Sequence, residues 1–182
     1  MITTNQEELA DRARLLRNLA FTTPRFRHEF AGYNFRMTGY QAAMGLAQLR
    51  RIEQIVAEKR RVARTYDRCL SDLSCIKIPT EATWARSVYW MYGLVVEPEF
   101  GITRDELMTK LRNDGIETRT FFCPMNQQPF LRSQPGYRES RCPVADRLWE
   151  RGLYLPSSYM LDEATIGSIA ESIKRARGSH AR

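Results

Sequence analysis

The stretch from Gly32 to Leu49 reads GYNFRMTGYQAAMGLAQL, and it passes from a Gly/Asn-rich turn into a helix lined with small residues. Thr38 and Gln41 have capping-box spacing, in which the hydroxyl accepts from the Gln41 N–H and the Gln41 amide reaches back. Asn34 and Arg36 therefore precede a helix N-terminus, where backbone N–H groups and the helix dipole favour an anion. The pattern is that of a phosphate-binding corner. An ordinary capped core helix with a solvated arginine is the alternative, and the spacing alone favours that alternative.

The flanking sequence predicts a mixture of helices and strands. Capping boxes are expected at Asn5/Glu8 and Thr103/Glu106, and Pro143 and Gly152 bracket one helix. Helices are expected over residues 5–19, 38–70 (with a possible break at 56–60), 103–113, 143–151 and 162–177. Strands are expected over 75–78, 87–96, 116–122 and 153–155. From about residue 71 onward, this order predicts an α/β sandwich, a small sheet with helices packed on one face.

Composition excludes several classes of protein. No window of the 182 residues approaches the roughly 18 uncharged apolar residues of a membrane span. The first eight residues are polar and acidic, unlike a signal peptide. The spacing of the four cysteines matches no zinc pattern, so no metal site is expected and free thiols in a reducing cytoplasm are the simplest interpretation. We therefore expect a cytoplasmic protein with no membrane partner.

The net charge of +7 raises the hypothesis of a basic polyanion-binding protein. The densest basic cluster would cover more than one face of a single helix, as a solvated surface does. Neither an RNA-binding aromatic signature nor a zinc knuckle accompanies it. These features do not favour specific nucleic-acid binding. The cluster contains Arg50, Arg51, Lys59, Arg60, Arg61 and Arg64.

Residues 32–49 also resemble the Gly-Tyr-Asn-Tyr-Arg-Met-Thr…Gln-Ala-Ala…Gly-Leu-Ala-Gln-Leu signature of the DegT/DnrJ-type sugar-nucleotide aminotransferases. These enzymes use pyridoxal phosphate (PLP), have the aspartate aminotransferase fold and place an amino group on a keto sugar. The pattern is most similar to the enzymes that make perosamine and related 4-amino sugars. Further blocks follow in the family's order, namely VYWMY (88–92), GIETR (115–119), PMNQQP (124–129), PVA (143–145) and RGLYLPS (151–157).

The resemblance implies that this chain is the C-terminal part of such an enzyme. Residues 1–70 would be the tail of the large domain and the long connecting helix, and residues 71–182 the small C-terminal α/β domain. Residues 1–9 resemble the segment just after the lysine that binds PLP covalently in the family. No lysine of this chain has that context, and Lys59 is expected on a charged helix face. We therefore expect no covalent PLP on this chain and no catalytic residue in it.

The resemblance also implies the binding residues. The family builds its site at a homodimer interface, so Asn34 would hydrogen-bond the PLP phosphate of the neighbouring subunit, with Arg36 beside it. Arg119 and Asn126 match positions that approach the nucleotide-sugar cavity. The family commonly has histidine where this chain has Asn126, and an amide cannot relay a proton near neutral pH.

Three hypotheses follow from the sequence. The first is a part of a sugar-nucleotide aminotransferase that is inactive alone and needs the upstream half or a homodimer partner. The second is a non-catalytic interaction module or remnant. The third is the basic polyanion-binding protein.

Overall fold

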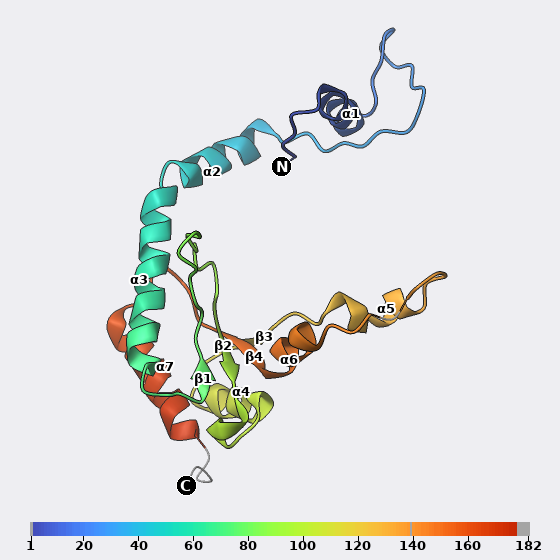
Figure 1. The fold of residues 1–182 in the computed structure, drawn as a ribbon. Helices are drawn as coiled ribbons and strands as arrows, with labels where there is room; N and C mark the ends of the chain where they lie inside the picture. Colours follow the sequence, from blue (N-terminus) through green and yellow to red (C-terminus); the bar gives the residue numbers. More distant parts are fainter. Residues whose placement is uncertain (1, 139, 178–182) are drawn as a thin grey trace. The chain divides into compact units, whose positions relative to one another are not determined.

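The computed structural model describes residues 2–138 and 140–177 (Figure 1). It divides into two compact units, one extending to Ile52 and one beginning at Glu53. The boundary predicted from the sequence lies at residue 70 instead, and the assignment of residues 1–70 and 71–182 to a large and a small domain stays a prediction. No helix in the described part of the chain is long and apolar enough to cross a membrane.

The first unit contains helices α1 (Glu7–Arg17) and α2 (Gly39–Leu49). The expected capping box at Asn5 is wrong, because the N-cap is Gln6, whose side chain makes no capping bond. The Gln6 N–H instead donates to the Thr4 hydroxyl at 3.1 Å, a local turn that delays the start of the helix. None of the residues of α2 is buried.

Residues 38–70 form two helices, not one. α2 ends at Leu49, and α3 (Ile52–Leu70) begins after a turn in which the Arg51 N–H donates to the Gln48 carbonyl at 3.0 Å. The single long helix expected over 38–70 is therefore wrong, and the interruption lies at Arg50–Arg51 and not in the region 56–60, where α3 is continuous. The buried residues Val62, Ala63, Tyr66 and Leu70 of α3 pack into one core.

The second unit is built on an antiparallel sheet of order β1-β2-β4-β3 (Figure 1). The strands are β1 (Ile76–Lys77), β2 (Tyr92–Val96), β3 (Arg119–Thr120) and β4 (Gly152–Leu155). The expected strand over 87–96 starts only at Tyr92, because Tyr89 has a positive φ of 44° that interrupts an extended backbone. The strand expected over 116–122 is likewise reduced to two residues.

The remaining helices are α4 (Arg104–Asn113), α5 (Pro129–Arg132), α6 (Pro143–Arg151) and α7 (Glu163–Ala176), with short 3₁₀ turns at Pro98–Phe100 and Met125–Gln127. The capping box at Thr103/Glu106 is confirmed, and so is Pro143 as a first helical residue. α3, α4 and α7 contribute buried side chains to one hydrophobic cluster with β1, β2 and β4. This cluster is the core that supports the pocket described below.

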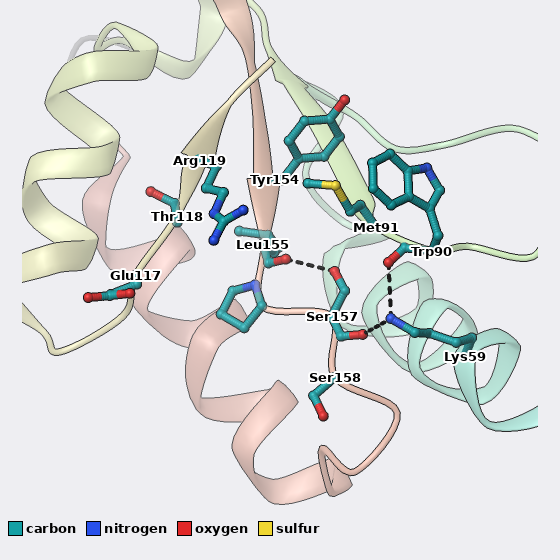
Figure 2. Close-up of a pocket in the computed structure, with 11 residues that line it drawn as sticks. Lys59, Trp90, Met91, Glu117, Thr118, Arg119, Tyr154, Leu155, Ser157 and Ser158 are labelled. Carbon is teal, nitrogen blue, oxygen red and sulfur yellow. Dashed lines mark hydrogen bonds between the residues drawn. The ribbon is translucent and has the colours of Figure 1, made fainter. Parts of the chain in front are cut away.

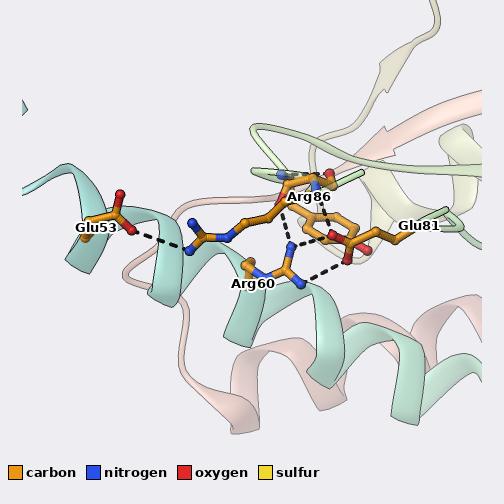
Figure 3. Close-up of polar contacts among 6 residues, drawn as sticks. Glu53, Arg60, Glu81 and Arg86 are labelled. Atoms are coloured by element: carbon orange, nitrogen blue, oxygen red, sulfur yellow. Dashed lines mark hydrogen bonds and ion pairs between the residues drawn. The ribbon is translucent and has the colours of Figure 1, made fainter. Parts of the chain in front are cut away.

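The long segment between β1 and β2, residues 78–91, is bound to α3 by charged side chains (Figure 3). The Arg60 guanidinium donates to both carboxylate oxygens of Glu81 at 2.9 Å and to the Ser87 carbonyl at 2.6 Å. Glu81 also accepts from the Ser87 N–H at 2.9 Å, and Arg86 pairs with Glu53 at 3.4 Å. The hydrogen bond from Arg60 lowers the pKa of the Glu81 carboxyl, so the pair stays charged at neutral pH.

Glu81→Ala is expected to speed hydrogen exchange of the Ser87 amide about tenfold, because one hydrogen bond to a charged acceptor is lost. Exchange measured by NMR on the intact chain tests this. Glu163→Ala is the matched control, since Glu163 and Arg68 form an exposed pair that holds no loop. Unchanged exchange at Ser87 in the Glu81 variant would show that these polar contacts do not hold the segment 78–91 in place.

Candidate functional site

The expected phosphate corner lies at the start of α2, and its capping box is confirmed. The Gln41 N–H donates to the Thr38 hydroxyl at 3.2 Å, and the Thr38 N–H donates to the Gln41 side-chain oxygen at 2.9 Å. The preceding loop is fixed to the end of α1. The Tyr33 and Phe35 N–H groups donate to the carbonyls of Leu16 and Arg17 at 2.7 and 3.0 Å. These bonds give the residue between them, Asn34, a defined backbone position.

Gly32 permits this close approach of loop and helix end. A Cβ at this position would lie 2.2 Å from the Ala20 nitrogen and 2.3 Å from the Leu19 carbonyl carbon. Those are backbone atoms, which cannot swing aside as a side chain can. Only glycine, which has no Cβ, therefore fits at this position.

Asn34 and Arg36 converge in this corner, and both are exposed. The Arg36 Nε donates to the Asn34 Oδ1 at 3.5 Å, a long contact that leaves the Asn34 amide hydrogens and most guanidinium donors available. Amide and guanidinium donors in the loop that leads into a helix N-terminus suit the oxygens of a phosphate. The donor set present here therefore fits the phosphate group of PLP.

Arg119 lines a pocket of about 490 Å³ in the second unit (Figure 2). Its wall is formed by Trp90 and Met91 just before β2, by Glu117 and Thr118 before β3, and by Tyr154 and Leu155 at the end of β4. The floor is the turn after β4, which contributes Pro156, Ser157 and Ser158.

That floor is held by hydrogen bonds from two other elements. The Ser157 hydroxyl accepts from the Tyr92 N–H at 2.8 Å, and the Tyr66 hydroxyl donates to the Pro156 carbonyl at 3.0 Å. Tyr92 in turn donates to the Asp67 carboxylate at 2.7 Å. Burial raises the pKa of both Tyr66 and Tyr92, so these hydroxyls remain donors at physiological pH. The pocket floor is thus positioned before any ligand arrives.

Lys59 enters the same pocket from α3, where the sequence analysis expects a charged helix face. Its ammonium donates to the Trp90 carbonyl at 3.0 Å and to the Ser157 carbonyl, residues 31 and 98 positions away. Burial lowers the pKa of Lys59 from its usual value. Helical spacing contains a signal for this placement, since Lys59 lies three, four and seven residues before the buried Val62, Ala63 and Tyr66.

Asn126 lies outside this pocket, in the loop between β3 and α6. Its amide nitrogen donates to the Ser140 carbonyl at 3.1 Å and to the Asp146 carboxylate at 3.4 Å. Its own carbonyl accepts from Arg132 and Tyr137. The residue therefore ties its loop together through its amide nitrogen and its backbone carbonyl. A substrate contact by Asn126 stays a prediction.

The basic cluster of the polyanion hypothesis is partly engaged within the protein. Arg60 pairs with Glu81, and Arg61 bonds to Glu58 and the Leu161 carbonyl. Cations held in this way are less available to a polyanion than a solvated face would be.

A sequence profile described as the DegT/DnrJ/EryC1/StrS aminotransferase family matches residues 1–174. The chain is 31% identical over 175 residues to a GDP-perosamine synthase of Vibrio cholerae, covering 96% of this chain and 47% of that protein. It is 35% identical over 176 residues to a GDP-perosamine synthase of Caulobacter vibrioides, covering 95% and 46%. The chain thus spans about half the length of the curated relatives it matches.

Solved structures agree with these matches. The structure of DesI in the presence of its TDP-sugar product superposes with a TM-score of 0.84 at 26% identity, covering 98% of this chain and 45% of that one. PseC of Helicobacter pylori, an aminotransferase of pseudoaminic acid biosynthesis, also has a TM-score of 0.84. At 21% identity over 96% of this chain and 47% of that one, it supports the fold alone.

Proposed function

Because the chain belongs to the DegT/DnrJ/EryC1/StrS aminotransferase family, we propose that it provides the C-terminal half of a PLP-dependent enzyme that transfers an amino group to a nucleotide-linked keto sugar. Enzymes of this family depend on PLP, and one structure superposing on this chain is a PLP form. The observation that carries the proposal is the convergence of Asn34 and Arg36 beside the capped start of α2. Among the keto sugars, the precursor of perosamine is the one that the relatives' names support.

Each residue has a role in this proposal. Asn34 and Arg36 donate to the phosphate of PLP in the neighbouring subunit, and Arg119 and Asn126 contact the nucleotide sugar. PLP, when bound, supplies the electron sink that amino transfer requires. The lysine that binds PLP covalently comes from the rest of the enzyme, so we propose that this chain alone is inactive.

The exposed apolar side chains of α2 support a protein partner. Tyr40, Met44 and Leu49 are 77%, 57% and 63% exposed, none of the residues of α2 is buried, and apolar surface of this extent marks an interaction site. We propose that the rest of the aminotransferase, from the same or a second subunit, covers this helix. Sedimentation of the chain alone is then expected to show self-association across the micromolar range.

Complementation tests the function. The chain is co-expressed with a polypeptide equivalent to the N-terminal half of its curated relatives, and the purified complex is assayed for PLP content and for amino transfer to a nucleotide-linked keto sugar. We expect both properties in the complex and neither in the chain alone. A complex without transfer would favour the non-catalytic alternative. Salt-sensitive nucleic-acid binding by the chain alone would favour the polyanion alternative.

A further inference from the structure

We propose that Lys59 and Arg119 together form an anion-binding site in the pocket of Figure 2, one that takes a small molecule carrying phosphate or carboxylate oxygens. The inference deepens the proposed function, on which its choice of ligands rests. It adds Lys59 to the binding residues and assigns a ligand chemistry to a pocket that the second unit builds by itself.

The first support is the incomplete coordination of the Lys59 ammonium. An ammonium has three N–H donors, and two are used by the Trp90 and Ser157 carbonyls. Those acceptors are neutral, and no ion pair in the described part of the chain joins Lys59 to a carboxylate. No carboxylate in the described residues therefore neutralises this partly buried charge, and an anion in the pocket would stabilise it.

The second support is Arg119, which enters the same pocket from β3. Figure 2 shows its guanidinium directed toward the Leu155–Ser157 segment, with Lys59 entering from a different element. Within residues 2–138 and 140–177, Arg119 forms no ion pair either. Glu117 also lines the pocket, so the lining carries two positive charges and one negative, a net attraction for an anion.

The third support is the setting of the two cations. Lys59 holds the floor of the pocket at Ser157 and its wall at Trp90, a residue that is 64% exposed. An exposed indole beside cationic donors suits a ligand that joins an anionic group to a flat or sugar-like ring. Two kinds of reactant share this anionic chemistry, the diphosphate of a nucleotide sugar and the carboxylates of an amino-acid donor.

Binding to the intact 182-residue chain tests the site without any turnover. The probes are inorganic pyrophosphate, guanosine diphosphate and L-glutamate, titrated at matched ionic strength and followed by calorimetry and by the indole N–H signal of Trp90. Lys59→Met removes the charge and keeps the stem, and Arg119→Gln removes the second cation. Each is expected to weaken pyrophosphate binding about tenfold to a hundredfold. Lys59→Arg, which retains a charge, is expected to recover part of that loss.

Lys110→Met is the matched control, because Lys110 is also a helix lysine that donates to a backbone carbonyl, that of Ala176. Lys59→Met also removes two hydrogen bonds to the pocket floor and wall, whereas Arg119 is exposed and its side chain forms no hydrogen bond within residues 2–138 and 140–177, so Arg119→Gln separates charge from folding. Tighter binding of guanosine diphosphate than of glutamate would identify a nucleotide site, and the reverse a donor site.

The proposal is overturned if none of the three probes binds the wild-type chain, or if they bind equally to the Lys59→Met and Arg119→Gln variants. Either result is independent of complementation, which could fail while this binding persists.

Discussion

Asn34→Ala and Arg36→Ala are each expected to weaken PLP retention by about tenfold to a hundredfold in the complemented enzyme, because each removes a donor to a dianionic phosphate. Both side chains are exposed, and they contact each other at 3.5 Å, so neither supports the core. Dissociation of PLP, followed by its absorbance during dialysis, measures the effect directly and does not require turnover.

Two variants serve as controls for this prediction. Asn5→Ala makes the same change at an asparagine that caps no helix in the first unit. Asn126→Ala changes a residue of the second unit whose amide bonds within its own loop, and it is expected to leave PLP retention alone and act on the sugar substrate. Unchanged retention in both the Asn34 and Arg36 variants would remove the case for a phosphate contact in trans. Surface-turn substitutions without such a role usually stay within about 0.5 kcal/mol.

Gly152→Ala is expected to destabilise the second unit by about 1–3 kcal/mol or more, because overpacking of this kind forces neighbouring atoms to move. The added Cβ would lie 2.2 Å from the Phe121 ring and 2.4 Å from the Leu148 carbonyl oxygen. The ring crosses the sheet face at Gly93 and Gly152 and packs 4.5 Å from the Tyr154 ring, between centroids. Urea unfolding monitored by circular dichroism measures the loss.

Gly167→Ala is the control, because it makes the same substitution inside α7 with nothing within 4 Å of the new Cβ. It is expected to stabilise the chain by about 0.5–1 kcal/mol, since alanine is the better helix former. Equal midpoints for the two variants would contradict the steric account of Gly152.

Helix caps were predictable from the sequence where the capping hydrogen bonds are local and no neighbouring side chain competes with them. Thr38/Gln41 and Thr103/Glu106 each close over three residues, so their spacing alone carries the geometry. The same spacing at Asn5/Glu8 misled, because the Thr4 hydroxyl engages the Gln6 N–H instead. The ordered motifs that indicated the family were likewise local, and the family is shown by the match over residues 1–174.

Gly152 and Lys59 are the residues whose roles depended on distant partners. Gly152 follows a helix and was interpreted as a helix-ending glycine, yet its φ is −88°, which any residue adopts. Its requirement comes from Phe121, which the fold brings across the sheet. Lys59 has acceptors 31 and 98 residues away, so sequence spacing could show the side of α3 on which it lies but not the pocket it enters.

From the sequence one can predict the family, the capped start of α2 with Asn34 and Arg36 before it, and the succession of most helices and strands. These depend on interactions within a few residues, which local chemistry dictates. The three-dimensional fold was needed to show where the long helix divides, how short the strands are, and that Lys59 and Arg119 line one pocket. Those outcomes depend on packing between segments far apart in the chain, and no local sequence pattern specifies which distant segments meet.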